Sequence, residues 1–227
     1  HNNKYYLQYG APGTEFSGYA DGVVVGDNPL GPFVPQSDPL SFKPGGFARG
    51  AGHGATFQDK WNNYWHVSTV VVSVKNNFER RIGIWPAGFD GDQMYCNTEF
   101  GDYPHFLPSG PADHLKSRFA GWMLLNYKKP VQVSSTFGNY APNNAVDENI
   151  KTYWCAAGAA PGEWIQTDLG AVSTVRAIQI NYADQDAGLL GKQTDIYHQY
   201  KMYHSADGKK WELLVDKSKN TTDVPHD

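Results

Sequence analysis

The sequence has few cysteines and no concentration of positive charge. Cys96 and Cys155 are its only cysteines, and they lie far apart without the spacing of metal ligands. We therefore expect two separate, half-buried thiols. The net charge is −4 and the pI is about 6.0, with no cluster of lysine and arginine. This composition argues against nucleic acid or an anionic membrane as a partner.

Long hydrophobic runs are also absent. No segment approaches the roughly 20 apolar residues that a membrane-spanning helix needs, and no signal-like segment opens the chain. The start at His1, without a methionine, predicts a piece of a longer protein. The 227 residues are 40% hydrophobic with a mean hydropathy of −0.55, which is typical of a water-soluble globular protein. For this length we expect two domains.

Helical patterns are scarce, and Pro111–Trp122 is the one candidate helix. Short runs rich in valine, isoleucine, tyrosine and tryptophan recur instead, bounded by glycine, proline, asparagine and aspartate. We predict strands in KYYLQYG, DGVVVGD, YWHVSTVVVSV, RIGIWPAGF, WIQTDLG and VRAIQINYA, and a hairpin in YKMYHSADGKKWELLV that turns at Asp207-Gly208. The chain is therefore predicted to be all-β.

Two features indicate how these strands are organised. The segment NNKYYLQYG at 2–10 resembles WNNYWHVST at 61–69, and the offset of 59 residues is near the size of a propeller blade. Composition then changes near Lys128, from Gly/Pro-rich loops with longer apolar strands to Asn/Asp/Thr-rich loops with short strands. We place a first domain at 1–110, a connector at 111–129 and a second domain at 130–227.

One stretch, GGFARGAGHGATF at 45–57, places five glycines around one arginine and His53. Glycine permits a close approach of other groups to the backbone, and it weakens any strand that it interrupts. We expect a ligand or another strand to lie against this segment.

The longer motifs resemble two known families, which together cover almost the whole chain. KYYLQYGAPGTE, DNPLGPF, GAGHGATFQD and ERRIGIWPAGFDGD resemble, in this order, the last two blades of the five-bladed propeller of family 43 glycoside hydrolases. NNAVDENIKTYW, WIQTDLG, VRAIQI and HSADGKKW resemble the coagulation factor 5/8 type C (discoidin) module, as found in family 32 carbohydrate-binding modules. The resemblances imply a partial five-bladed β-propeller followed by a galactose-binding-like (discoidin) β-sandwich that is incomplete.

The first resemblance implies an activity for the parent protein. Family 43 includes β-xylosidases and α-arabinofuranosidases, which hydrolyse glycosyl bonds of plant polysaccharides with inversion, using two carboxyl groups roughly 6.5–9.5 Å apart. In the family these carboxyl groups, and a third acidic residue that tunes the acid, precede the segment that matches the start of this chain. We therefore expect this chain to lack the catalytic acids and to be inactive alone. The alternative is a non-catalytic glycan-binding or adhesion protein.

Two basic residues match positions in the family's central cavity. His53 falls on a histidine that faces a cation on the propeller axis, which implies calcium bound directly or through water. The alternative for His53 is a core histidine bonded to a carbonyl group or water. Arg80 falls on an arginine that points into the substrate pocket, where a guanidinium can donate to sugar hydroxyls. Arg81 competes for this role, because neighbouring side chains of a strand point to opposite faces.

Acidic and aromatic residues complete the expected pocket. Glu15 and Asp21 are the acidic residues nearest the cavity by family position, but we assign neither of them as acid or base, since the family's acid lies upstream. Phe16, Tyr19 and Trp85 could offer ring faces for stacking a sugar, although aromatic residues of β proteins more often lie in the core.

The second resemblance implies a calcium site in the NNAVDENIKTYW loop. The matching positions are Asn144, Asp147, Asn149 and Thr152, whose oxygens are the hard ligands that calcium prefers. The family usually adds a glutamate near its C-terminal strand, and this sequence has no match for it, so the site is expected to be incomplete. The alternative is a loop held by its own side chains without an ion.

The long segment from Tyr182 to Tyr200 mixes tyrosines with polar residues and is expected to carry sugar binding. Leu189, Leu190 and Lys192 resemble the loop tips of phospholipid binders, but the association with an enzyme favours carbohydrate. The expected partners are a polysaccharide or oligosaccharide, and either the missing blades of the same enzyme or a second copy of this chain. The family resemblance places the protein outside the cell, in the periplasm or at the cell surface.

Overall fold

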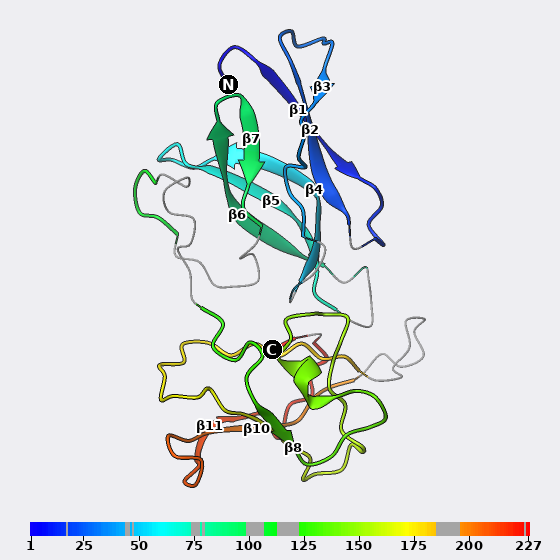
Figure 1. Ribbon diagram of the computed structural model, residues 1–227, viewed down its shortest axis with the longest axis vertical. Helices are drawn as coiled ribbons and strands as arrows, with labels where there is room; N and C mark the ends of the chain where they lie inside the picture. The colour runs from blue at the N-terminus through cyan, green and yellow to red at the C-terminus, as the bar shows by residue number, and fades with distance from the viewer. Residues whose placement is uncertain are drawn as a thin grey trace. The chain divides into compact units, whose positions relative to one another are not determined.

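The computed structural model describes residues 1–227 except 17, 44–45, 47, 74–77, 79, 99–106, 113–122, 185–195 and 225 (Figure 1). The chain divides into two compact units. Unit 1 comprises His1–Val72, Asn77–Leu124 and Glu148–Ile150, and unit 2 comprises Ser73–Asn76, Leu125–Asp147 and Lys151–Asp227. In the described residues the regular structure is β, apart from the short 3₁₀ helix η1 (Pro142–Ala145). This confirms the all-β prediction.

Unit 1 contains two antiparallel sheets, in which each strand pairs with the next one along the chain. The three-stranded sheet consists of β1 (Tyr5–Ala11), β2 (Ala20–Gly26) and β3 (Val34–Pro35), and the four-stranded sheet of β4 (Arg49–Gln58), β5 (Tyr64–Val71), β6 (Arg80–Asp90) and β7 (Gln93–Cys96). A four-stranded antiparallel meander is the form of one propeller blade. The two sheets are therefore consistent with part of a propeller.

The repeated sequence has a structural counterpart. Tyr5-Tyr6 opens β1 and Tyr64-Trp65 opens β5, and each of these strands pairs with the strand that follows it. The order β1-β2-β3 thus corresponds to β5-β6-β7. Strand β4 contacts both β1 and β2, so the two sheets pack on each other through β4.

The core of unit 1 has two apolar clusters. One gathers Ala51, Val70 and Val72 around the fully buried Trp85, and the other consists of Val23, Leu40 and Met94. Burial of each large side chain contributes about 1.5–3 kcal/mol relative to its exposure.

Apolar side chains also remain on the outer faces of both sheets. Tyr5, Leu7 and Tyr9, at alternate positions of β1, are exposed, and so are Ile82 and Ile84 of β6. Side chains at alternate positions share one face of a strand. Unit 1 therefore presents apolar sheet faces to solvent.

Unit 2 has shorter strands. Its pairs are β8 (Val131–Val133) with β9 (Ile165–Thr167), and β10 (Lys201–His204) with β11 (Glu212–Asp216). The predicted hairpin is confirmed, because β10 and β11 flank a turn in which Gly208 has φ +67° and the Asp207 carboxylate accepts hydrogen bonds from the backbone of Lys209 and Lys210.

One predicted strand is wrong. The segment VRAIQINYA at 175–183 forms no strand and has only the bridge between Asn181 and His226. Ile180 and Asp227 exchange two backbone hydrogen bonds of 2.9 Å. A strand needs a partner over several successive residues, and this contact is too short to supply one.

Two further predictions concern helices and cysteines. The candidate helix at Pro111–Trp122 lies outside the described residues from 113 onward. Among the helices of the described segments, none is long and apolar enough to cross a membrane. Cys96 and Cys155 form no disulfide and are partly buried, as expected. Burial raises the pKa of the Cys96 thiol.

Candidate functional site

His53 lies in a distorted part of β4. The pairing of β4 with β5 shifts register twice, and each time β4 has one more residue than β5 between successive pairs. The pairs are Arg49 with Val71, Gly52 with Thr69 and Ala55 with Val67. Such β-bulges bend a strand and re-aim a side chain, and they recur beside active sites. His53 has φ +62° and an exposed side chain. A histidine with positive φ is uncommon and costs backbone energy, which favours a role for its direction.

The glycines beside His53 accommodate other side chains. A Cβ atom on Gly52 would lie 2.7 Å from the ring of Tyr19. On Gly54 it would lie 2.4 Å from Asp21 Oδ2, 2.6 Å from His66 Nε2 and 2.3 Å from the Val67 carbonyl oxygen. The close approach expected at this stretch is therefore made by Tyr19, which precedes β2, by a side chain of β2, and by a side chain and the backbone of β5.

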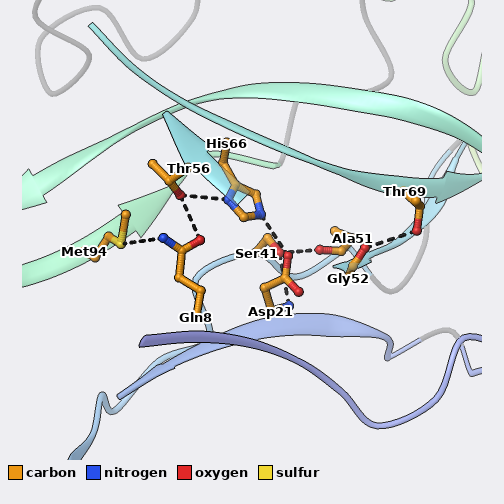
Figure 2. Close-up of polar contacts among 9 residues, drawn as sticks. All are labelled: Gln8, Asp21, Ser41, Ala51, Gly52, Thr56, His66, Thr69 and Met94. Atoms are coloured by element: carbon orange, nitrogen blue, oxygen red, sulfur yellow. Dashed lines mark hydrogen bonds and ion pairs between the residues drawn. The ribbon is translucent and has the colours of Figure 1, made fainter. Parts of the chain in front are cut away.

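These side chains belong to a buried polar network between the two sheets (Figure 2). His66 on β5 has no exposed side-chain surface, and its Nε2 lies 3.0 Å from Oδ2 of the equally buried Asp21 on β2. Its Nδ1 lies 2.9 Å from the hydroxyl of Thr56 on β4, which donates to Gln8 Oε1 on β1 at 3.1 Å. The Gln8 amide reaches Met94 Sδ on β7 at 3.8 Å.

Ser41 extends this network. Its hydroxyl accepts from the backbone N–H of Asp21 at 3.2 Å and donates to the carbonyl of Ala51, beside the bulged part of β4. The other carboxylate oxygen of Asp21, Oδ1, is buried and has no hydrogen-bond partner among the described residues. Buried polar groups are costly unless they are paired, so the chain of contacts fixes how the two sheets meet.

Sequence reasoning did not single out His66, Thr56 or Gln8. Each lies in a run of strand-forming residues, where a polar residue gives no signal by itself. The available signal was the alternation along β5, in which His66 and Ser68 share a face with Val70 and are buried like it. Polar residues on a buried face require partners on the facing strands.

Acidic residues of the expected pocket differ in exposure. Glu15 is exposed in the loop between β1 and β2. Asp21 is 1% exposed and engaged with His66, so a sugar in solvent does not reach it in this structure.

The aromatic residues proposed for sugar stacking also differ in exposure. Phe16 is exposed, whereas Tyr19 is buried over Gly52 and Trp85 is fully buried in the apolar cluster. Trp85 and Tyr19 therefore serve as core residues in the described structure, as aromatic residues of β proteins commonly do. Of the three, Phe16 alone offers an open ring.

Arg80 and Arg81 occupy different surroundings. The guanidinium carbon of Arg80 lies 6.0 Å from the centre of the Tyr19 ring and 5.5 Å from that of Phe78, which is cation–π geometry. Arg81 is exposed and donates to the carbonyl of Arg80. The Tyr19 ring therefore lies close both to the Arg80 guanidinium and to Gly52, the residue before His53.

The two ends of the expected calcium loop, which lie in unit 2, are held by their own side chains. Thr152 Oγ1 donates to Asp147 Oδ2 at 2.6 Å, and Asn144 Nδ2 donates to the Tyr153 carbonyl at 3.1 Å. Asn149 is exposed. The described residues contain no group of three or more His, Cys, Asp or Glu that could hold a metal ion. Asp147 and Thr152 nevertheless bring together two oxygens of the type that calcium prefers.

The sugar loop predicted between Tyr182 and Tyr200 is described only at its ends. Its centre, which includes Leu189, Leu190 and Lys192, lies outside the described residues. At its ends, the rings of Tyr182 and His198 stack 3.7 Å apart, and His198 Nε2 lies 2.6 Å from Asp184 Oδ1.

Comparison with known proteins finds a domain family that matches the C-terminal part of the chain. Residues 130–227 match the family model of the F5/8 type C domain. No curated protein matches the chain.

Solved structures similar to the chain include several glycoside hydrolases, and the likeness to family 43 lies in the N-terminal part. A thermostable family-43 glycoside hydrolase is 22% identical over 42% of this chain and 32% of its own, with a TM-score of 0.37. An endo-1,4-beta-xylanase from Bacteroides thetaiotaomicron is 30% identical over 42% of this chain and 34% of its own, with a TM-score of 0.39. A protein described as a glycoside hydrolase is 22% identical over 100% of this chain and 51% of its own, with a TM-score of 0.44. The chain thus spans about a third to a half of these structures.

Proposed function

We propose that the chain is part of a glycoside hydrolase that acts on xylosyl or arabinosyl residues of plant polysaccharides, and that its F5/8 type C domain binds carbohydrate. The match of residues 130–227 carries the binding half of the proposal. The enzyme half rests on the motif order of residues 1–104 and on the bulge that turns His53 outward from a blade-like sheet. The parent protein is proposed to act outside the cell, in the periplasm or at the cell surface, where such polymers are met.

Affinity electrophoresis tests the binding half. We expect migration of the chain to be slowed in gels that contain xylan, arabinoxylan or arabinan, relative to a gel without polysaccharide. Unchanged migration in every gel would contradict carbohydrate binding by this chain.

A hydrolysis assay tests the enzyme half of the proposal. We expect no turnover of aryl xylosides or arabinosides by this chain alone, because positioning without an acid and a base leaves most of the barrier standing. Turnover that Glu15→Gln abolishes would contradict the proposal that the catalytic acids lie elsewhere. Binding without any hydrolysis by the full-length parent would favour the non-catalytic glycan-binding alternative.

The exposed faces of unit 1 support a proposal about its partner. Tyr5, Leu7 and Tyr9 on β1 and Ile82 and Ile84 on β6 form apolar sheet faces of the kind that another layer covers. We propose that these faces pack against further blades of the same enzyme or against a second copy of the chain. Sedimentation tests this: a compact monomer without a companion chain would contradict it.

Calcium is proposed for the Asn144–Thr152 loop, with Asp147 and Thr152 as ligands. Ion binding requires that the Thr152 hydroxyl stop donating to Asp147 and turn a lone pair toward the ion. Calcium titration followed by calorimetry is expected to give heat with this chain and none with Asp147→Ala. Equal heats for both would exclude this loop as the site.

A further inference from the structure

Three aromatic rings form a stack on the loops of unit 2, apart from the residues of the expected calcium and sugar loops. Phe137 and Tyr140 lie with ring centres 6.2 Å apart and planes 6° from parallel, and Tyr140 stacks on Tyr153 at 4.7 Å and 18°. The rings come from two segments, 137–140 and 153, that lie apart in the sequence. We call Phe137, Tyr140 and Tyr153 the aromatic stack.

The backbone holds the aromatic stack in place. Phe137 N–H donates to the Cys155 carbonyl at 2.8 Å, Cys155 N–H donates to the Tyr140 carbonyl at 3.4 Å, and Tyr140 N–H closes a turn on the Phe137 carbonyl at 3.2 Å. The Asn144 amide also donates to the Tyr153 carbonyl. A platform fixed in this way loses little conformational entropy when a ligand binds.

The end of the aromatic stack is open. Phe137 is 46% exposed, and a Cβ atom on the neighbouring Gly138 would meet nothing within 4 Å. The segment SSTFGNYAP at 134–142 contains no charged residue. The hydroxyls of Ser134 and Ser135 bond to the Glu163 carboxylate, and the exposed side chains of Thr136 and Asn139 provide neutral hydrogen-bonding groups. Such a surface suits a ligand that has an apolar C–H face and neutral hydroxyls, and it lacks the basic residues that attract anionic lipid.

We propose that the aromatic stack is a sugar-binding subsite, in which the ring of Phe137 packs against the C–H face of one uncharged pyranose or furanose residue. Thr136 and Asn139, both exposed beside it, are placed to bond the sugar hydroxyls. The proposal rests on carbohydrate binding by the F5/8 type C domain and assigns that binding to particular residues.

The test is calorimetric titration of the full chain with neutral xylo- and arabino-oligosaccharides. Phe137→Ala is expected to weaken binding about tenfold or more, since truncation of a central aromatic contact commonly has an effect of this size. Phe137→Leu keeps an apolar side chain but removes the aromatic face, so it is expected to lose affinity similarly, whereas Phe137→Tyr keeps it. Trp211→Ala, at an aromatic residue with 44% exposure beside the β10–β11 hairpin, is the matched control and should bind as the unaltered chain does.

The outcomes separate the subsite from the proposed function. If the unaltered chain binds sugar and Phe137→Ala binds it with the same affinity, the subsite is overturned and carbohydrate binding by the chain is left intact. No binding by the unaltered chain to any of these oligosaccharides or to the polysaccharide gels would overturn both. Full affinity in Phe137→Leu would show a packing role and also overturn the subsite. If the chain binds phosphatidylcholine vesicles through Phe137 and binds no sugar, the ligand of the aromatic stack is a lipid surface and the sugar-binding subsite is overturned.

Discussion

Unit 1 buries apolar side chains between long strands, whereas unit 2 is held mainly by hydrogen bonds within its loops. Among the buried hydrophobic residues of the described chain, Val146 alone belongs to unit 2. In unit 2 the carboxylates of Glu163, Asp207 and Asp227 accept bonds from serine, backbone and lysine groups instead. The difference indicates that unit 1 depends on the fit between its sheets, and that unit 2 tolerates single losses better.

The largest expected effect comes from Gly54→Ala in unit 1. The new methyl group would meet the Val67 carbonyl oxygen and the Asp21–His66 contact at 2.3–2.6 Å, and none of these groups is a flexible side-chain end. We expect unit 1 to lose about 3 kcal/mol of stability. Hydrogen exchange followed by mass spectrometry measures each unit separately.

Gly158→Ala is the matched control in unit 2, because its added methyl group meets nothing within 4 Å. It should leave exchange unchanged in both units. Equal protection of β4 and β5 in Gly54→Ala and in the unaltered chain would contradict the close packing of the two sheets.

A smaller loss is expected when the buried network is broken. Asp21→Ala leaves the buried His66 Nε2 without its partner, which costs about 1–3 kcal/mol. Chemical denaturation measures this loss as a change in the free energy of unfolding. The single variants Asp21→Ala and Thr56→Val, compared with the double variant, test whether the two contacts of His66 are coupled. Strictly additive effects would mean that the network does not act as a unit.

The sequence was sufficient for the strands of unit 1 but not for its interior. Runs rich in valine, isoleucine, tyrosine and tryptophan mark β1, β2, β5 and β6, because such residues suit a strand whether the face that carries them is buried or exposed. The Asp21–His66 contact joins residues 45 positions apart, and only the packing of two sheets brings them together. The bulges at His53 were likewise unpredictable, since they depend on the register with β5 and not on local propensity.

In unit 2 the turns were readable and the strand at 175–183 was not. Asp207-Gly208 has turn chemistry in its own residues, so its prediction needs no distant partner. The run VRAIQINYA has strand propensity but pairs only at Ile180 and Asn181. Propensity describes fit to a sheet and does not supply the neighbouring strand.

Acid should weaken both units over the same range. Burial alone would raise the pKa of Asp59, but bonds from Trp65, Asn63 and Trp61 lower it from 3.8 to about 2. A lowered pKa stabilises the fold above the unfolded value, and this contribution is lost as the pH falls from about 4 toward 2. Thermal unfolding between pH 5 and pH 2 should show it, and Asp59→Asn should remove it from unit 1.

Asp216 is the counterpart in unit 2. The side chain and backbone of Ser218, together with Lys201, lower its pKa to about 2. Asp216→Asn should therefore flatten the acid dependence of unit 2 and leave that of unit 1 in place. A pH profile unaffected by either substitution would show that these turns do not contribute.

The smallest effect is expected from an exposed ion pair. Lys201 Nζ lies 3.2 Å from Asp216 Oδ2, and both side chains are more than 40% exposed. Lys201→Ala should change stability by at most about 0.5 kcal/mol, because solvent and salt screen such pairs. A loss near that of Asp21→Ala would contradict the contrast between the two units.

Backbone amide chemical shifts of the full chain, recorded during titration with a neutral xylo- or arabino-oligosaccharide, test the central claim most directly. Saturable shifts at residues 134–141 and 152–158 of unit 2, with little change along β1 to β7, are predicted by carbohydrate binding through the F5/8 type C domain. Shifts confined to β4–β6 around His53, or no shifts at millimolar sugar, would contradict it.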